Sequence, residues 1–197
     1  MLLPHIRGRI ALGTIVNATG LSARHVKEKF SFAEAETDAA KVFGSNGTAP
    51  HAVMIGTRHH LHAPLVLEGL RASRHVFVEK PLCLSIDELV QIESEACAMG
   101  ERAGLLMVGF NRRFSPAAVA VRKFFADCLE PITVSIRFNA GTLPADHWTQ
   151  DELVGGGRII GEACHFIDML TFLVGAPPVS VTAHALPDNG KYRDDNV

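Results

Sequence analysis

A lysine at the end of an apolar run is the first residue whose position suggests chemistry. The segment His75–Pro81 reads HVFVEKP, so Lys80 follows a short apolar strand and precedes a proline. Ligands of open parallel sheets bind beyond the carboxyl ends of the strands, which is where this pattern places the amine. Pro81 restricts the backbone of Lys80 and so limits the directions of its side chain. Lys80 is a candidate for proton transfer, although a solvated lysine at a strand end would have the same sequence.

A second group of candidates lies on one apolar helix near the carboxyl end. Glu162, His165 and Asp168 follow one another at intervals of three in GGGRIIGEACHFIDMLTFLVG, so their side chains share a helical face. Polar groups on a buried element need partners or serve a function. His165 is therefore a candidate acid or base. The alternative is a core histidine bonded to Asp168 and to a backbone carbonyl. A metal site is less favoured because no further ligand set is evident.

Three histidines follow the apolar run AVMIG, in the sequence Thr57-Arg58-His59-His60-Leu61-His62. Their density could indicate a metal site. However, His59 and His60 are adjacent and point to different sides. A loop at the carboxyl edge of a sheet that contacts a ligand is the better interpretation.

Short apolar runs and helical stretches alternate through the first half of the sequence. Strands are predicted over 12–18, 52–56, 75–78 and 105–110, with a helix over 62–73 among the segments between them. This alternation predicts an α/β protein with a doubly wound parallel sheet.

The helix boundaries carry clear local signals. Ser85 and Glu88 form a capping-box pattern, and Ser115-Pro116 is typical of a helix start. After residue 130 the sequence pattern changes. In 131–139 and 179–186, apolar and polar residues alternate with period two, which predicts half-buried strands on either side, in sequence, of a helix over 158–174. We expect two domains, 1–113 and 114–197, that meet near Phe114.

The composition excludes several classes of function. The chain has 197 residues, 47% apolar and 20% charged, with a formal charge of −2, so nucleic acid finds no basic face to bind. No apolar run is long enough for a membrane helix, and the opening segment does not resemble a signal peptide. We therefore expect a cytoplasmic protein whose four scattered cysteines are buried thiols.

Four segments together resemble the Gfo/Idh/MocA family of oxidoreductases. They are AVMIGTRHHLHAPLVLEGL, HVFVEKPL, VGFNRRFSP and GGGRIIGEACHFIDMLTFLVG, in the family's order and spacing. The resemblance implies a Rossmann-like dinucleotide-binding domain followed by an α+β open-sheet domain. It also implies hydride transfer between NAD or NADP and a hydroxyl or ketone of a sugar-like small molecule. Members often pair as homo-oligomers through the sheet of the second domain.

The resemblance assigns roles residue by residue. Lys80 matches the catalytic lysine and His165 the active-site histidine, which act together as acid and base on the substrate hydroxyl. The implied cofactor-lining residues are Thr57, Arg58, His62, Glu79 and Pro81. The expected substrate-side residues are Asn111, Arg112, Trp148 and Asp168.

The sequence departs from the family pattern in two places. Many members have an aspartate four residues before the histidine, where this sequence has Gly161, and Glu162 is the candidate to replace it. No G-x-G-x-x-G turn precedes the strand at Leu12, so the sheet is expected to lack its first strand and Gly-rich turn. We therefore expect a chain truncated at both ends, which leaves open a non-catalytic scaffold that no longer binds cofactor. A metal-dependent hydrolase that uses the clustered histidines is a further alternative, but the missing ligand pattern argues against it.

The cofactor's ribose contact is also altered. The predicted second strand of the family fold ends in Asn17-Ala18-Thr19-Gly20, without the acidic residue that usually binds the ribose. No carboxylate there would repel a 2′-phosphate, and Arg24 lies close by in the sequence. NADP is thus as acceptable as NAD.

Overall fold

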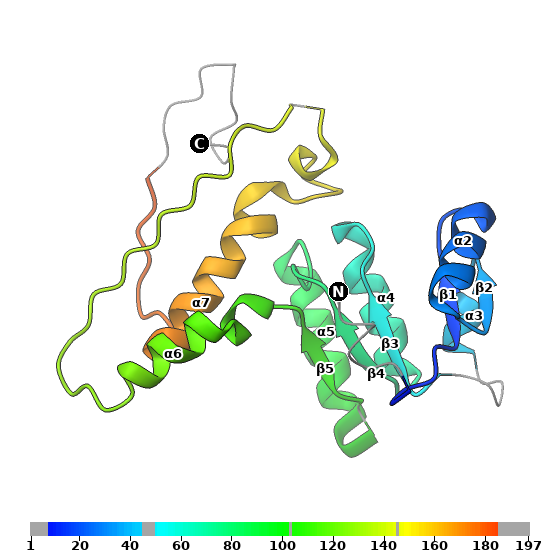
Figure 1. Ribbon diagram of the computed structural model, residues 1–197, viewed down its shortest axis with the longest axis horizontal. Helices are drawn as coiled ribbons and strands as arrows, with labels where there is room; N and C mark the ends of the chain where they lie inside the picture. The colour runs from blue at the N-terminus through cyan, green and yellow to red at the C-terminus, as the bar shows by residue number, and fades with distance from the viewer. Residues whose placement is uncertain (1–7, 45–49, 103, 145, 185–197) are drawn as a thin grey trace.

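The computed structural model describes residues 8–44, 50–102, 104–144 and 146–184, and its two halves differ in architecture. The first half alternates parallel strands with helices, whereas the second is built on two helices and extended segments (Figure 1). The elements of the first half are β1 (Thr14–Val16), α2 (Gly20–Phe30), β2 (Glu34–Glu36), α3 (Ala40–Phe43), β3 (Ala52–Ile55), α4 (His62–Arg71), β4 (His75–Val78), α5 (Ile86–Met99) and β5 (Leu106–Val108). The helices of the second half are α6 (Pro116–Phe124) and α7 (Cys164–Val174).

All the strands pair in parallel, as the sequence predicts, but they form two sheets. β1 pairs with β2, and β3, β4 and β5 form a second sheet in that order. No ladder joins β1 to β3 within the described residues. The usual order of a dinucleotide-binding sheet places its first strand between the second and the fourth. The break lies where that strand, which the sequence pattern lacks, would stand.

The apolar core of the larger sheet lies between its strands and helices α4 and α5. Val66 and Leu70 of α4 are fully buried against Val76 and Val78 of β4. Gly69 permits this close approach, because a Cβ there would lie 2.6 Å from Cγ2 of Val76. The core therefore fixes the carboxyl ends of β3 and β4, where the candidate residues begin.

The helix starts predicted after Ser85 and Ser115 and the helix end predicted at Gly175 are confirmed, whereas the helix predicted over 62–73 ends at Arg71 and the one predicted from 158 becomes α-helical only at Cys164. At the start of α5, the Glu88 amide donates to Oγ of Ser85 at 3.1 Å, and Oε2 of Glu88 accepts from the Ser85 amide at 3.2 Å. Ser115 caps α6 in the same way. Gly175 ends α7 with a φ of 80°, in the left-handed region that glycine adopts freely.

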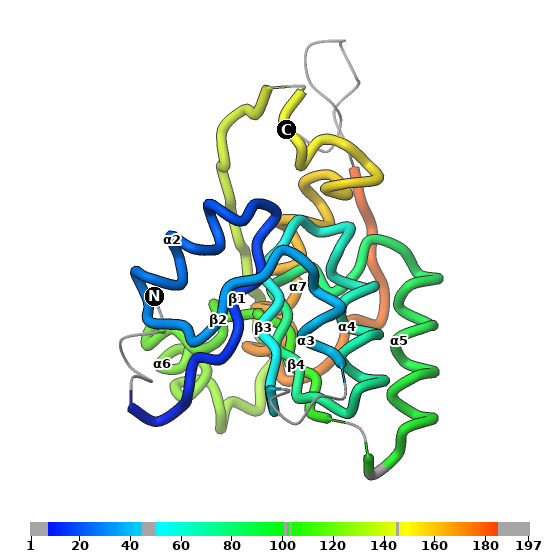
Figure 2. Tube along the Cα trace, turned by 90° about the vertical axis from the view of Figure 1, so that its right-hand side faces the viewer, coloured from blue at the N-terminus to red at the C-terminus, as the bar shows by residue number. Residues whose placement is uncertain are grey.

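The strands predicted in the second half are not formed by the described residues. Residues 131–139 and 179–184 are extended but form no ladder, and 185–186 lie outside the described residues. Figure 2 shows the two segments on opposite sides of α7. Alternating apolar residues are not sufficient for a strand, because a strand also needs a neighbour for its backbone hydrogen bonds.

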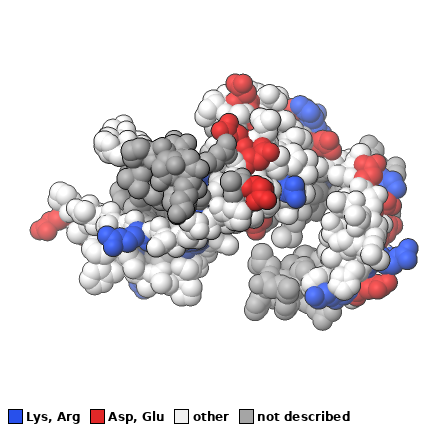
Figure 3. Space-filling view, turned by 90° about the horizontal axis from the view of Figure 1, so that it is seen from above, with Lys and Arg blue, Asp and Glu red and all other residues white. Residues whose placement is uncertain are grey.

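Charged side chains are unevenly distributed over the surface. In the view of Figure 3, few of them lie on the left-hand side, whereas red and blue side chains are mixed over the centre and the right-hand side. None of the helices among the described residues is long and apolar enough to cross a membrane.

The four cysteines all lie in the described part of the chain and are free thiols. Cys83 and Cys164 are partly buried, and burial raises the pKa of both. Cys97 and Cys128 are exposed, so the expectation that all four are buried was wrong. Both lie on outer surfaces, at the end of α5 and after α6.

Candidate active site between the two halves

Lys80 leaves the carboxyl end of β4 and reaches across to the second half of the chain. The Glu79 amide donates to Ile55 O at 2.9 Å, which fixes the backbone next to the lysine. Nζ of Lys80 then donates to the carbonyl oxygen of Gly161 at 2.5 Å. The side chain is half-buried. The amine of Lys80 is thus held in one direction by a hydrogen bond, and the interpretation as a freely solvated strand-end lysine was wrong.

His62 ties together the two loops beside the lysine. It is fully buried, with Nδ1 2.6 Å from Pro81 O and Nε2 3.1 Å from Thr57 O. The loop after β3 and the turn after β4 are therefore held by one side chain. Because both ring nitrogens of His62 face backbone carbonyls, the imidazole connects these two loops and presents neither nitrogen to the surface.

His59 and Trp148 join the first half to the loop before α7. Nδ1 of His59 donates to Gly155 O at 2.7 Å, and the indole of Trp148 packs edge-on against the imidazole at 4.8 Å. Arg58 lies over the same indole at 5.7 Å. Burial lowers the pKa of His59, and the Gly155 carbonyl only partly opposes this effect. The result is a packed wall of rings beside Lys80.

His165 is buried on α7 and retains an unused nitrogen. It is 7% exposed, and its Nδ1 has no hydrogen-bond partner among the described residues. Burial lowers the pKa of His165, and the positive charges of Lys80 and Arg112 lower it further. A neutral imidazole with an unsatisfied, buried nitrogen is suited to exchange a proton with a bound ligand.

Asp168 pairs with an arginine and not with the histidine. Nε of Arg113 donates to Oδ2 of Asp168 at 2.9 Å, and a second guanidinium nitrogen bonds Oδ1. This pairing raises the pKa of Arg113. The interpretation of His165 as a core residue satisfied by Asp168 was therefore wrong. Arg113 was missed because Arg112 and Arg113 are adjacent, and the sequence does not show which one turns inward.

The remaining candidates lie around this centre at different depths. Glu162 is half-buried, and its charge acts on the pKa of His165. The guanidinium of Arg112 lies over the Phe166 ring at 4.7 Å. Asn111 is exposed in the short turn before α6, and Glu79 is exposed after β4. Among the described residues, no three metal-ligating side chains gather as a metal site requires.

The carboxyl edge of the larger sheet is suited to the reacting end of a dinucleotide but not to its diphosphate. Thr57, Lys80 and His165 gather there, at the edge where open sheets place the reacting end of a ligand. The turn from β1 to α2 is instead closed on itself, because Thr19 caps Ser22 N at 3.3 Å. No Gly-rich strand-to-helix turn occurs in the described ranges to hold a diphosphate.

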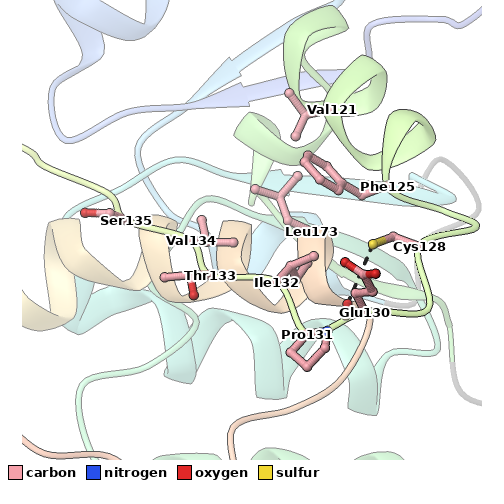
Figure 4. A pocket seen from close by; sticks show the side chains of 10 residues that line it. All are labelled: Val121, Phe125, Cys128, Glu130, Pro131, Ile132, Thr133, Val134, Ser135 and Leu173. Carbon is pink, nitrogen blue, oxygen red and sulfur yellow. Dashed lines mark hydrogen bonds between the residues drawn. The ribbon is translucent and has the colours of Figure 1, made fainter.

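A separate apolar cavity lies in the second half of the chain. It measures about 450 Å³ and is formed by α6, the end of α7 and the extended segment after residue 130 (Figure 4). Val121, Phe125 and Leu173 face it from the helices, and Ile132 and Val134 from the segment. None of the candidate catalytic residues lines it, so it is a packing feature of this half.

Parallel strands that alternate with helices, followed by a second half built on two helices, define a Rossmann-type α/β architecture. Family comparison agrees: residues 5–110 match the oxidoreductase family with an NAD-binding Rossmann fold, and residues 130–197 match the C-terminal alpha/beta domain of that family. The chain belongs to the Gfo/Idh/MocA oxidoreductase family.

Individual relatives agree with this assignment. Inositol 2-dehydrogenase of Rhizobium meliloti (strain 1021) is 36% identical over 159 residues, covering 74% of this chain and 45% of its own length. Levoglucosan dehydrogenase of Pseudarthrobacter phenanthrenivorans is 27% identical, covering 82% of this chain and 42% of its own. The chain thus spans less than half the length of these relatives.

Solved structures show the same fold. An oxidoreductase domain protein from Kribbella flavida superposes with a TM-score of 0.70 at 23% identity, over 84% of this chain and 44% of its own. Levoglucosan dehydrogenase in complex with NADH and levoglucosan superposes with a TM-score of 0.68 at 22% identity, over 88% of this chain and 49% of its own.

Proposed function

We propose that the protein transfers hydride between NAD or NADP and a hydroxyl or ketone of a sugar-like substrate, with Lys80 and His165 as its acid–base pair. One observation carries the proposal: Lys80 bonds to Gly161 one helical turn before His165, and its charge lowers the pKa of that histidine. Two groups from different halves of the chain thus face the same site.

The chemistry of this pair fits the oxidation of an alcohol. The nicotinamide supplies the hydride acceptor when it is bound. His165, neutral and with Nδ1 unpartnered among the described residues, can take the hydroxyl proton. The Lys80 ammonium can stabilise the oxygen that loses this proton, and the charge of Glu162 acts on His165. In the reverse direction the same pair returns the proton to a ketone.

The substrate class is proposed from the relatives. Their names specify inositol 2-dehydrogenase and levoglucosan dehydrogenase, which act on a polyol and an anhydrosugar. Arg112, Trp148 and Asn111 are the side chains we propose to face such a substrate, with Asp168 acting through Arg113. We keep 1–113 and 114–197 as the cofactor and substrate domains. The ranges of the two family models support this division.

The proposal is tested in the complete protein. Lys80→Met and His165→Asn should each lower kcat for a responsive polyol or sugar by at least about 100-fold, as expected for loss of an acid or base. The Kd for NADH should change little. Lys123→Met, on the exposed surface of α6, serves as the matched control. Near-normal kcat in both site variants would exclude the assigned roles.

A second candidate function is a folded scaffold without catalysis. The observation that favours it is that the described residues contain no Gly-rich strand-to-helix turn, because binding without diphosphate contacts from such a turn is weaker. Titration of this chain with NADH and with NADPH, followed by fluorescence and calorimetry, separates the candidates. Binding tighter than about 100 μM supports the enzyme and shows which cofactor is preferred, whereas no binding of either supports the scaffold.

We also propose that the chain self-associates through its second half. Among the described residues of that half, sixteen large apolar side chains are exposed, including Val121, Ile132, Val134 and Ile136. Exposed apolar surface of this extent marks an interaction site.

A further inference from the structure

The helix that carries His165 begins with an irregular turn. Ile159–Ala163 is π-helical, and the Cys164 amide donates to Ile159 O, five residues back instead of four. Such turns contain one residue more than the α-helical ladder accommodates, and they recur at functional sites. The carbonyl that receives Lys80, at Gly161, lies in the middle of this turn.

Glycine is the residue that fits position 161. The residue is buried, and a Cβ built there would lie 3.1 Å from Cε1 of His59 and 3.8 Å from Gly155 O. His59 has little freedom to move, because its Nδ1 is bonded to Gly155 O and its ring packs on Trp148. A side chain at 161 would therefore displace either His59 or the turn.

We infer that Gly161 is the positioning residue for Lys80. The π-helical turn presents the carbonyl of Gly161 to the lysine, and because glycine has no side chain, this carbonyl stays within hydrogen-bond distance of Nζ. This inference rests on the proposed role of Lys80 as an acid or base. No ion pair joins Lys80 to Glu162 in the part of the chain that the structure describes, so the expectation that Glu162 replaces the family's aspartate is not supported. A backbone dipole directs the ammonium here.

The difference between a carbonyl and a carboxylate has a chemical consequence. A carboxylate would neutralise the ammonium, whereas a carbonyl orients it and leaves its full charge in the site. That charge acts on His165, whose pKa it lowers. The histidine is thereby kept available as a base, so the glycine supports both members of the pair.

The contact can be observed without turnover. Labelling with carbonyl-¹³C glycine and ¹⁵N glutamate isolates two peptide bonds, Gly161–Glu162 and Gly100–Glu101, because only these glycines precede a glutamate. In Lys80→Met, the carbonyl signal of Gly161 should shift, since its hydrogen bond is lost, while that of Gly100 stays in place. An unshifted Gly161 signal would overturn the inference.

A set of variants tests why glycine is needed. Gly161→Ala should raise the labelling rate of Lys80 by an amine reagent about five-fold relative to exposed Lys123, the ratio expected for one lost hydrogen bond. In a His59→Ala background, where the added Cβ has room, the same change should have less than about a two-fold effect. Ile159→Ala, at an exposed position of the same turn, is the control and should leave the rate unchanged.

The outcomes separate the inference from the proposed function. If Gly161→Ala raised the labelling rate of Lys80 equally in the wild-type and His59→Ala backgrounds, His59 would not be the reason that glycine is required. If the rate rose in neither background, the positioning role of Gly161 would be overturned. If the contact is confirmed but Lys80→Met retains turnover in the complete protein, the proposed function fails while the contact stands. A merely structural role for Gly161 would change the melting midpoint without a selective effect on Lys80.

Discussion

At the scale of single residues, burial keeps two histidines of the site in their neutral form. Both His59 and His165 have their pKa lowered below the ordinary 6.5, chiefly by burial. Between the lowered pKa and 6.5, the folded chain binds fewer protons than the unfolded chain. Stability therefore rises with pH through this window, is fully present above it, and is lost as the pH falls through the folded-state pKa.

His165→Asn should reduce this acid sensitivity. The groups that act on His165 are Lys80 and Arg112, which oppose its protonation, and Asp168 and Glu162, which favour it. The urea midpoint of the wild type should fall between about pH 7.5 and about pH 5.5, and that fall should be smaller in the variant. Adding His59→Asn should reduce it again. The same fall in the double variant and the wild type would contradict the assignment.

The pair between Arg113 and Asp168 gives a second residue-scale prediction. The Asp168 side chain is 7% exposed and that of Arg113 33%, so solvent screens the pair only partly. Asp168→Asn should lower the free energy of unfolding by about 2 kcal/mol, less than for a fully buried pair. Glu95→Gln, which breaks the exposed pair with Arg71, should cost less than about 0.5 kcal/mol. Similar losses in the two variants, measured by urea denaturation, would show that burial is not decisive.

The candidate residues themselves could be found from the sequence, but their contacts could not. Lys80 and His165 stand in recognisable local patterns, a strand end and a polar face of an apolar helix. The partner of Lys80 is a backbone carbonyl 81 positions away, and every residue carries a carbonyl. Likewise, the sequence names Asp168 without indicating that Arg113 will reach it.

At the scale of elements, the capping box of α5 makes a local contribution to stability. Ser85→Ala removes the oxygen that accepts from Glu88 N, so the free energy of unfolding should fall by about 1 kcal/mol. Ser94→Ala makes the same change at an exposed position inside the helix, where alanine is the better helix former, and should cost nothing. Thermal or urea unfolding compares the two. An equal effect of both changes would rule out the cap as the cause.

The starts of α5 and α6 were predicted correctly because their signals are complete within four residues. The strands at 131–139 and 179–184 were not, because a strand forms only when a neighbour accepts its hydrogen bonds. Period-two alternation describes which face a segment could bury, and not whether a partner is present. For the same reason the parallel pairing of β3, β4 and β5 was predictable, while the break between β1 and β3 depended on a strand that the sequence does not supply.

At the scale of the whole molecule, the exposed apolar surface of the second half predicts self-association. Ile132 and Val134 are each 36% exposed and line the cavity beside α6. Ile132→Glu with Val134→Glu should shift the chain toward the monomer in sedimentation velocity across a concentration series. Leu21→Glu removes an equally apolar side chain, 83% exposed on α2, and should leave the distribution unchanged. A wild-type chain that is monomeric at every concentration would contradict the proposal.

The hydrogen bonds from Lys80 to Gly161 and from His59 to Gly155, and the pair of Arg113 with Asp168, all run from the first half of the chain to the second. The bonds that prepare the site are therefore also bonds that clamp the halves together. A hinge motion wide enough to admit or release a large ligand would withdraw the lysine from its carbonyl and let water reach the histidine. During such a motion, exchange of ligands and readiness for proton transfer would exclude each other.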